Sequence, residues 1–131
     1  MSAFDLSTNP IHLGLGASAV EEPEFTGDMA WYGGYVERHG DDGAEGRLVT
    51  MHHFSEDWDS WEMHPRGHEA VICVSGSLTL VQEIDGGSVE TILAAGQAAI
   101  NEPGVWHTAK VSEPAQVLFI TAGAGTEHRP L

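Results

Sequence analysis

From residue 29 onward the sequence is a succession of short runs of β-branched and aromatic residues, each ended by glycine, proline, aspartate or asparagine. Several of these runs alternate polar with apolar residues, as strands with one buried face do. No segment sustains a helical apolar repeat over ten positions, so the pattern does not favour helices. The predicted strands span residues 30–36, 47–54, 58–64, 69–75, 77–84, 88–93, 97–100, 105–111 and 116–122.

The number and spacing of these strands predict the fold class. Eight or nine short strands separated by turns are typical of a sandwich or barrel, and a closed barrel leaves no strand edge exposed. With 131 residues the chain has the size of one domain. We expect an all-β barrel over residues 29–131, preceded by an irregular N-terminal arm over residues 1–28. Prolines and glycines interrupt that arm and leave room for at most a helical turn or two.

The charge and the cysteine content exclude several classes of protein. The chain has 20 Asp and Glu against 5 Lys and Arg, a formal net charge of −15. A nucleic-acid duplex or an anionic membrane would repel such a surface, so we expect neither as a partner. The single cysteine, Cys73, excludes a disulfide within the chain and a metal site with several cysteine ligands. The first residues lack the pattern of a secretory signal, and we expect a cytoplasmic protein.

Two histidines and two glutamates form a candidate metal site. Glu62 and His64 lie two positions apart on a predicted strand, so both side chains point to the same face. A turn at 65–67 can bring Glu69 back beside His64, and His107 starts a later strand after a Pro-Gly turn. Two imidazoles and two carboxylates suit one divalent transition metal such as Fe, Mn, Zn or Ni.

The spacing of these residues resembles the two motifs of the cupin superfamily, in particular the small single-domain bacterial "cupin 2" type. Segment 62–76 resembles His-x-His-x(3–4)-Glu-x(6)-Gly, and segment 96–107 resembles Gly-x(5)-Pro-x-Gly-x(2)-His. The matching residues are His64, Glu69 and Gly76 in the first motif, and Gly96, Gly104 and His107 in the second. The resemblance implies a jelly-roll β-barrel, one divalent transition metal per chain, a small-molecule substrate or ligand, and a homodimer.

The sequence departs from the family pattern at three positions. Glu102 replaces a proline of the second motif, although the Pro-Gly turn is kept, and Val111 replaces the closing asparagine. Glu62 stands where the first motif has its first histidine. Glu62 is therefore open to two roles, as a metal ligand or as a catalytic base beside the metal.

Four further residues are candidates for a substrate pocket. Trp58 shares the face of Glu62 by strand parity, and Cys73 points inward from Glu69, where a small buried hydrophobic residue is expected rather than a nucleophile. Of the adjacent His52 and His53, only one can face inward, and His53 is taken as the pocket candidate. Arg66, in the ligand loop, can bind a substrate carboxylate or simply remain solvated.

Cupins host many functions, so several hypotheses remain open. The first is a metal-dependent enzyme that polarises or oxidises a small oxygen-bearing molecule, as a dioxygenase or as a lyase, isomerase or cyclase, with Glu62 moving a proton. The second is a non-catalytic small-ligand-binding or sensor barrel. The third is a metal-free barrel in which the four polar residues are structural.

Overall fold

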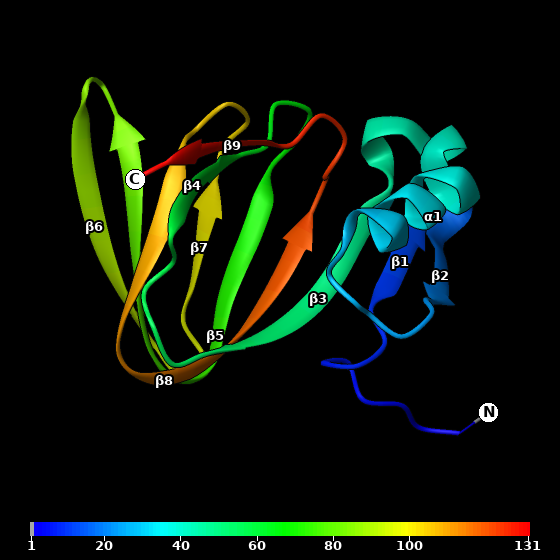
Figure 1. Cartoon of the computed structure of the whole chain (residues 1–131), viewed down its shortest axis with the longest axis horizontal. Coiled ribbons are helices and arrows are strands. Elements are labelled where there is room, and N and C mark those ends of the chain that lie inside the picture. Colours follow the sequence, from blue (N-terminus) through cyan, green and yellow to red (C-terminus); the bar gives the residue numbers. More distant parts are fainter. Residues whose placement is uncertain (1) are drawn as a thin grey trace.

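The computed structural model describes residues 2–131 and shows an all-β jelly-roll barrel, which confirms the predicted fold class (Figure 1). The strands are β1 (Ile11–Gly14), β2 (Ser18–Glu21), β3 (Arg47–Phe54), β4 (Ser60–Met63), β5 (Glu69–Ile84), β6 (Gly87–Ala94), β7 (Ala98–Asn101), β8 (His107–Thr121) and β9 (Glu127–Pro130). The helices are α1 (Met29–His39) and the short 3₁₀ segments η1 (Leu15–Ala17) and η2 (Gly40–Glu45). None of the helices in the described residues has the length and apolar character needed to span a bilayer.

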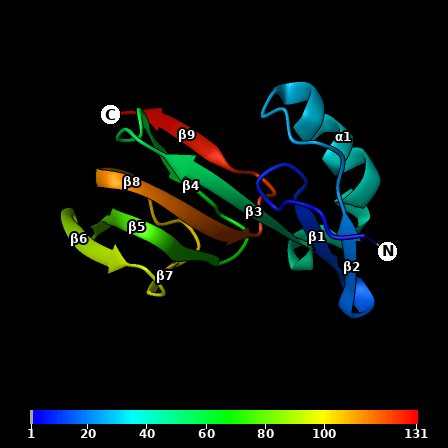
Figure 2. The same ribbon diagram turned by 90° about the horizontal axis from the view of Figure 1, so that it is seen from below.

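Strand β8 holds the barrel together, because it pairs antiparallel with β3, β4 and β5. Strand β5 in turn pairs with β6 and β7, while β9 extends the sheet beyond β4. At the other end, β1 joins the sheet beside β3 and carries β2 on its outer edge. Figure 2 shows α1 beside β1 and β2, away from β6 and β7.

Strands β5 and β8 are each longer than predicted, because each joins two predicted strands into one. The pairing register between them shifts between Cys73 and Thr79 without ending the ladder. Gly76 lies in this irregular stretch with φ of 76°, and a Cβ atom there would collide with the backbone of Pro114 on β8. Glycine therefore lets both strands bend at this point instead of stopping. The bend is visible at the lower end of the barrel in Figure 1.

The core lies between the inward faces of these bent strands. Its fully or nearly fully buried members are Val71, Cys73, Leu78, Leu93, Ala109, Ala115, Val117 and Phe119. Leu93 lies on β6, and the others lie on β5 and β8, where they alternate with less buried residues as the two-residue period of a strand requires. Phe54 and Trp58 pack against this cluster from the side of β3 and β4.

The segment predicted as a strand at 30–36 is instead part of helix α1, and that prediction was wrong. The carboxylate of Asp28 accepts a hydrogen bond from the backbone N–H of Trp31 and caps the helix. Trp31 and Tyr35, one helical turn apart, stack with their rings 5.7 Å apart, and Trp31 packs edge-on against Phe25. Aromatic contacts, including one between Trp31 and Phe25 outside the helix, therefore help to stabilise α1. The local pattern of apolar residues carries no information about such contacts.

Two further strand predictions need correction. The arm expected to be irregular contains β1 and β2, which form a hairpin around Gly16, a residue with φ of 71°. Strand β1 also pairs with β3, so the edge of the barrel supplies the partner that its short, weakly patterned sequence needs. Strand β9 was not predicted either; Arg129 holds it in place over the rings of Trp61 and Trp106.

Buried polar contacts tie α1 and the segment after it to the N-terminal hairpin. His12, on β1, accepts a hydrogen bond at Nδ1 from the Tyr35 hydroxyl over 2.6 Å. Its Nε2 donates to the Asp42 carboxylate, also over 2.6 Å. Burial raises the pKa of Tyr35, in keeping with a hydroxyl that keeps its proton and donates it.

Glu22 makes the second set of contacts between the hairpin and the helix. Its carboxylate is almost fully buried and accepts hydrogen bonds from Arg38 over 2.9 Å and from His39 Nε2 over 2.8 Å. The imidazole of His39 also stacks on that of His12, with the ring centres 3.8 Å apart. The position of α1 over the barrel therefore depends on charged groups and not only on apolar packing.

We predict that Glu22→Gln destabilises the protein by about 1–3 kcal/mol, because Arg38 and His39 lose their charged acceptor. Urea unfolding measures the loss of stability. Hydrogen exchange should show that, among the helices and strands of the variant, the backbone amides of α1 are the least protected. Glu21→Gln is the matched control, since Glu21 is exposed and should change stability little. Equal stability of the two variants would contradict this role of Glu22.

Candidate metal centre

The structure brings the four predicted ligands together. Glu62 lies on β4, His64 directly follows that strand, Glu69 begins β5 and His107 begins β8. One potential ligand atom from each residue lies within 4.8 Å of the others. Glu62 is paired with His107 across β4 and β8, which explains how residues far apart in sequence meet. His64, Glu69 and His107 are buried, and Glu62 is partly exposed.

The two imidazoles are oriented by hydrogen bonds at Nδ1. The Thr126 hydroxyl donates to the carbonyl of Gly123, so it can only accept from His64 Nδ1–H, over 2.8 Å. His107 Nδ1–H donates to the carbonyl of Val105 over 3.1 Å. In the neutral imidazoles the lone pair is therefore on Nε2, and both Nε2 atoms point into the centre.

The Nε2 atoms face carboxylate oxygens and have no hydrogen-bond partner in the described part of the chain, although both are buried. His64 Nε2 lies 3.2 Å from Glu62 and 3.1 Å from Glu69, and His107 Nε2 lies 3.2 Å from Glu69. Lone pairs on nitrogen and oxygen repel each other at this separation unless a proton or a cation lies between them. The donor set therefore fits a divalent transition metal.

Hydrogen bonds also fix the Glu69 carboxylate. Asn101 donates to one oxygen over 3.0 Å and the Thr121 hydroxyl donates to the other over 2.6 Å. Asn101 is held in turn by Gln82, whose amide nitrogen donates to its side-chain oxygen over 2.7 Å. Sequence reasoning missed these three residues and Thr126, because amides and hydroxyls on distant strands carry no local signal of a shared partner.

Charge and burial oppose each other at this centre. Burial alone would raise the pKa of Glu69, but the neighbouring imidazoles of His107 and His64 hold it well below its ordinary value. Burial alone would lower the pKa of His64, but the carboxylates of Glu62 and Glu69 outweigh burial and raise it to about 9. In the metal-free protein at neutral pH, a proton on His64 therefore takes the place that a cation can occupy.

A large cavity, of about 1200 Å³, reaches the centre from outside. Helix α1 contributes Met29, Tyr32 and Val36 to its wall, and Phe54 and Phe119 also line it. Glu62, His64 and Glu69 lie among its lining residues. The cavity therefore connects the candidate metal centre with a space large enough for a small organic molecule.

Two of the four predicted pocket residues line the large cavity and two do not. Trp58 and His53 line the cavity, with Trp58 partly buried and its ring edge-on to His107. His53 is exposed, whereas its neighbour His52 also lines the cavity and packs near Phe119.

The other two pocket candidates lie elsewhere. Cys73 is fully buried in the core, where burial raises the pKa of its thiol, and Arg66 is exposed. Neither residue is among those that line the large cavity.

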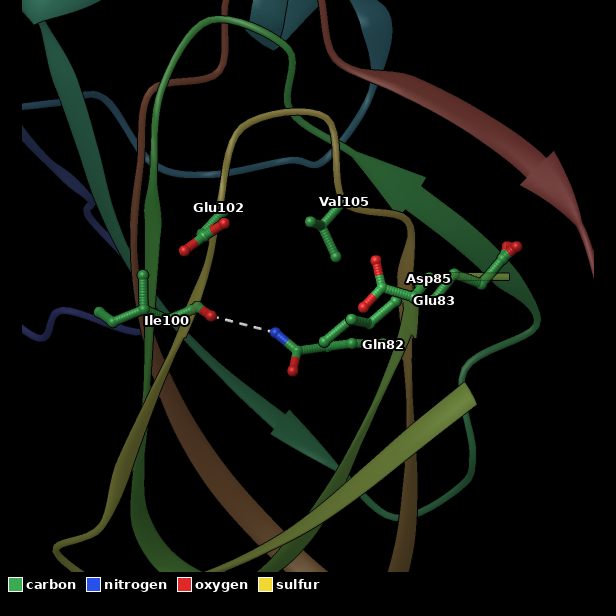
Figure 3. A pocket seen from close by; sticks show the side chains of 7 residues that line it. Gln82, Glu83, Asp85, Ile100, Glu102 and Val105 are labelled. Carbon is green, nitrogen blue, oxygen red and sulfur yellow. Dashed lines mark hydrogen bonds between the residues drawn. The ribbon is translucent and has the colours of Figure 1, made fainter. Parts of the chain in front are cut away.

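A smaller hollow of about 430 Å³ lies beside Gln82 and carries no comparable site (Figure 3). Its polar lining residues include Glu83, Asp85 and Glu102. The amide nitrogen of Gln82 is occupied, because it donates to the carbonyl of Ile100 and to the side chain of Asn101.

A second group of possible ligands, His12, His39 and Asp42, lies under α1. Both ring nitrogens of His12 already have hydrogen-bond partners there, which fits a structural role. The orphaned Nε2 atoms thus distinguish the first group from this one.

Comparison with solved structures agrees with the fold. An uncharacterised conserved protein with a double-stranded β-helix domain from Klebsiella pneumoniae is 29% identical, with a TM-score of 0.53, over 65% of this chain and 76% of that one. An oxalate oxidase matches at 15% identity and a TM-score of 0.52, over 61% of this chain and 44% of that one. The Fe(II) form of HppE matches at 15% identity and a TM-score of 0.50, over 57% and 42%.

Comparison with protein families shows the family to which the barrel segment belongs. No curated protein matches the chain in sequence. The model of the cupin domain matches residues 47–121, which contain all four candidate ligands and more than half of the chain. Strands β1, β2 and β9 and helix α1 lie outside the matched residues. The matched segment, together with the antiparallel barrel it forms, shows that this protein belongs to the cupin family, as its two sequence motifs indicate.

Proposed function

We propose that the protein is a metal-dependent enzyme that acts on a small oxygen-bearing organic molecule bound in the large cavity. The observation that carries the proposal is the convergence of two buried, unpartnered Nε2 lone pairs on two carboxylates at the inner end of that cavity. Both ring nitrogens of His12 have hydrogen-bond partners, whereas the Nε2 atoms of His64 and His107 face carboxylate oxygens across gaps that only a proton or a cation can fill.

Glu62, His64, Glu69 and His107 would hold one divalent transition metal per chain, with Fe, Mn, Zn and Ni all compatible with the donor set. When bound, such an ion supplies Lewis acidity toward a substrate oxygen or, if it is iron, redox chemistry with O₂. Lewis-acid chemistry would correspond to a lyase, isomerase or cyclase, and redox chemistry with O₂ to a dioxygenase. Oxalate oxidase and Fe(II)-HppE, which share the fold, are in keeping with a metal-dependent function.

The two carboxylates differ in a way that suggests separate roles. The Glu69 side chain is 4% exposed and is held by Asn101 and Thr121, so it is fixed in place. The Glu62 side chain is 28% exposed, and the described residues give it no such hydrogen-bond donors beyond the nearby imidazoles. We assign Glu62 as the group that accepts a proton from a bound substrate, because it combines access to the cavity with freedom to move.

The cytoplasmic location and the homodimer expected from the sequence remain proposals. Exposed apolar side chains on β5, β6 and β7, namely Val74, Ile92 and Ile100, are compatible with a second copy of the chain covering that part of the sheet.

We predict that His107→Ala removes most of the bound metal, because the ion loses a buried ligand that no neighbouring side chain replaces. His64→Ala should behave in the same way. Elemental analysis of protein purified without chelator measures the metal, and circular dichroism checks that the β-fold is kept. His68→Ala is the matched control, since His68 is exposed and lies outside the cluster. Full metal occupancy in the His107→Ala variant would overturn the ligand assignment.

We predict that apparent metal affinity rises about tenfold per pH unit between about pH 6 and pH 8. The metal-free protein holds a proton on His64 up to a pKa of about 9, and metal binding must displace it. Competition with a chromophoric chelator at several pH values, corrected for protonation of the chelator, gives the slope. An affinity that does not change over this range would show that no proton is displaced.

We predict that Glu62→Gln lowers turnover far more than metal content. The amide can still lie beside the ion but cannot accept a proton. A panel of diketones, hydroxy acids and phenols, tested with and without O₂, supplies the assay. Equal loss of metal and turnover would mean that Glu62 acts as a ligand alone and would contradict its assignment as the base. Tight binding of panel members to the metal-loaded native protein without any turnover would favour a sensor or ligand-binding barrel.

A further inference from the structure

The large cavity contains carboxylates but neither lysine nor arginine. Its acidic lining residues are Asp28, Glu56, Asp57, Asp59, Glu62 and Glu69. None of the 5 Lys and Arg residues of the chain lines it. Three of those five form ion pairs elsewhere, Arg38 with Glu22, Lys110 with Glu90 and Arg129 with Glu83. The lysine and arginine side chains with which proteins most often bind carboxylates and phosphates are therefore missing from the wall.

The metal centre does not supply the missing positive charge. Two carboxylates and two neutral imidazoles around a divalent ion give a formal charge of zero. Without the ion, even two protonated imidazoles only balance the charges of Glu62 and Glu69. An anion entering the cavity would thus meet the acidic groups of the rim with no compensating cation at the inner end.

Aromatic side chains form a large part of the rest of the wall, together with histidines, serines and threonines. Phe25, Tyr32, Phe54, Trp58 and Phe119 all line the cavity. The Phe25 ring lies 5.8 Å from that of Tyr32, and Trp58 lies 5.5 Å from Phe54 and 5.9 Å from Phe119. Rings at these distances provide faces and edges against which a flat ring can pack, and their faces also attract cations.

We propose that the cavity binds a neutral or cationic aromatic molecule and discriminates against anionic carboxylates and phosphates. The proposal rests on the proposed function only in taking this ligand as the substrate; the charge preference itself follows from the lining residues. The possible role of Arg66 in binding a substrate carboxylate has no support in this cavity, which Arg66 does not line.

Three phenols with the same ring and different side-chain charge test the preference. Tyramine is cationic, para-ethylphenol is neutral and para-hydroxyphenylpropionate is anionic at neutral pH. Calorimetric titration into protein loaded with Zn²⁺ and into metal-free protein, at low ionic strength, gives the three affinities without any need for turnover. We expect para-hydroxyphenylpropionate to bind at least about tenfold more weakly than para-ethylphenol, and tyramine to bind at least as tightly as para-ethylphenol.

Charge-reversal variants test whether the charge preference arises from the residues that line the cavity. The double variant Glu56→Lys, Asp59→Lys places two cations on the rim and should narrow or reverse the order of the three phenols. The control, Glu90→Lys with Glu113→Lys, makes the same change in net charge outside the cavity and should leave the order intact. Because none of these residues belongs to the metal centre, metal content should stay unchanged in both proteins.

The outcomes separate this proposal from the proposed function. Equal or tighter binding of the anionic phenol to the native protein would overturn the charge preference, as would a failure of all three phenols to bind in both metal states. A protein that takes up no metal but keeps the predicted order would overturn the metal-dependent function and leave the charge preference standing. The charge preference of the cavity would also be overturned if the control double variant changed the affinity order of the three phenols as much as the rim double variant. The net charge of the protein would then explain the selectivity.

Discussion

The barrel depends on a bend that only glycine permits. At Gly76 the backbone of β5 passes so close to Pro114 on β8 that no Cβ atom fits, and φ is positive. The paired strands turn back together at this point, so the two ends of the same ladder approach each other. Glu69, at one end, thereby comes within 3.2 Å of His107, at the other. The candidate metal ligands meet because a backbone contact at the other end of the barrel allows the sheet to fold.

The sequence was informative where the determinants are local. Strand β3 has the predicted bounds, and the period of two placed Glu62 and His64 on one face, where the structure also has them. The sequence was uninformative where contacts between distant segments determine the local structure. Helix α1 depends on contacts of Trp31 with Phe25 and Tyr35, and β9 depends on Arg129 lying over two tryptophan rings. Thr126 and Asn101 likewise gain their roles only when the barrel closes.

Glu62, which stands where the first cupin motif has a histidine, changes the electrostatics of the candidate centre. The carboxylate occupies a position from which it reaches both His64 and the cavity. It also adds one negative charge relative to a centre with a third neutral imidazole. The acidic rim and the absence of lysine and arginine from the wall act in the same direction. Glu62 and the acidic residues of the wall therefore both favour a neutral or cationic ligand over an anion.

Helix α1 and the segment before it provide one wall of the cavity, but they lie outside the residues matched by the cupin domain and carry none of the four candidate metal ligands. Contacts through Glu22 and His12 fasten this wall to the N-terminal hairpin. Part of the cavity wall is therefore encoded on a different stretch of the chain from the candidate ligands, while Phe54, Trp58 and Phe119 line the cavity from within the matched segment. Such an arrangement lets this part of the wall be exchanged or mutated, by evolution or by a protein engineer, while the barrel with the four candidate ligands is inherited unchanged.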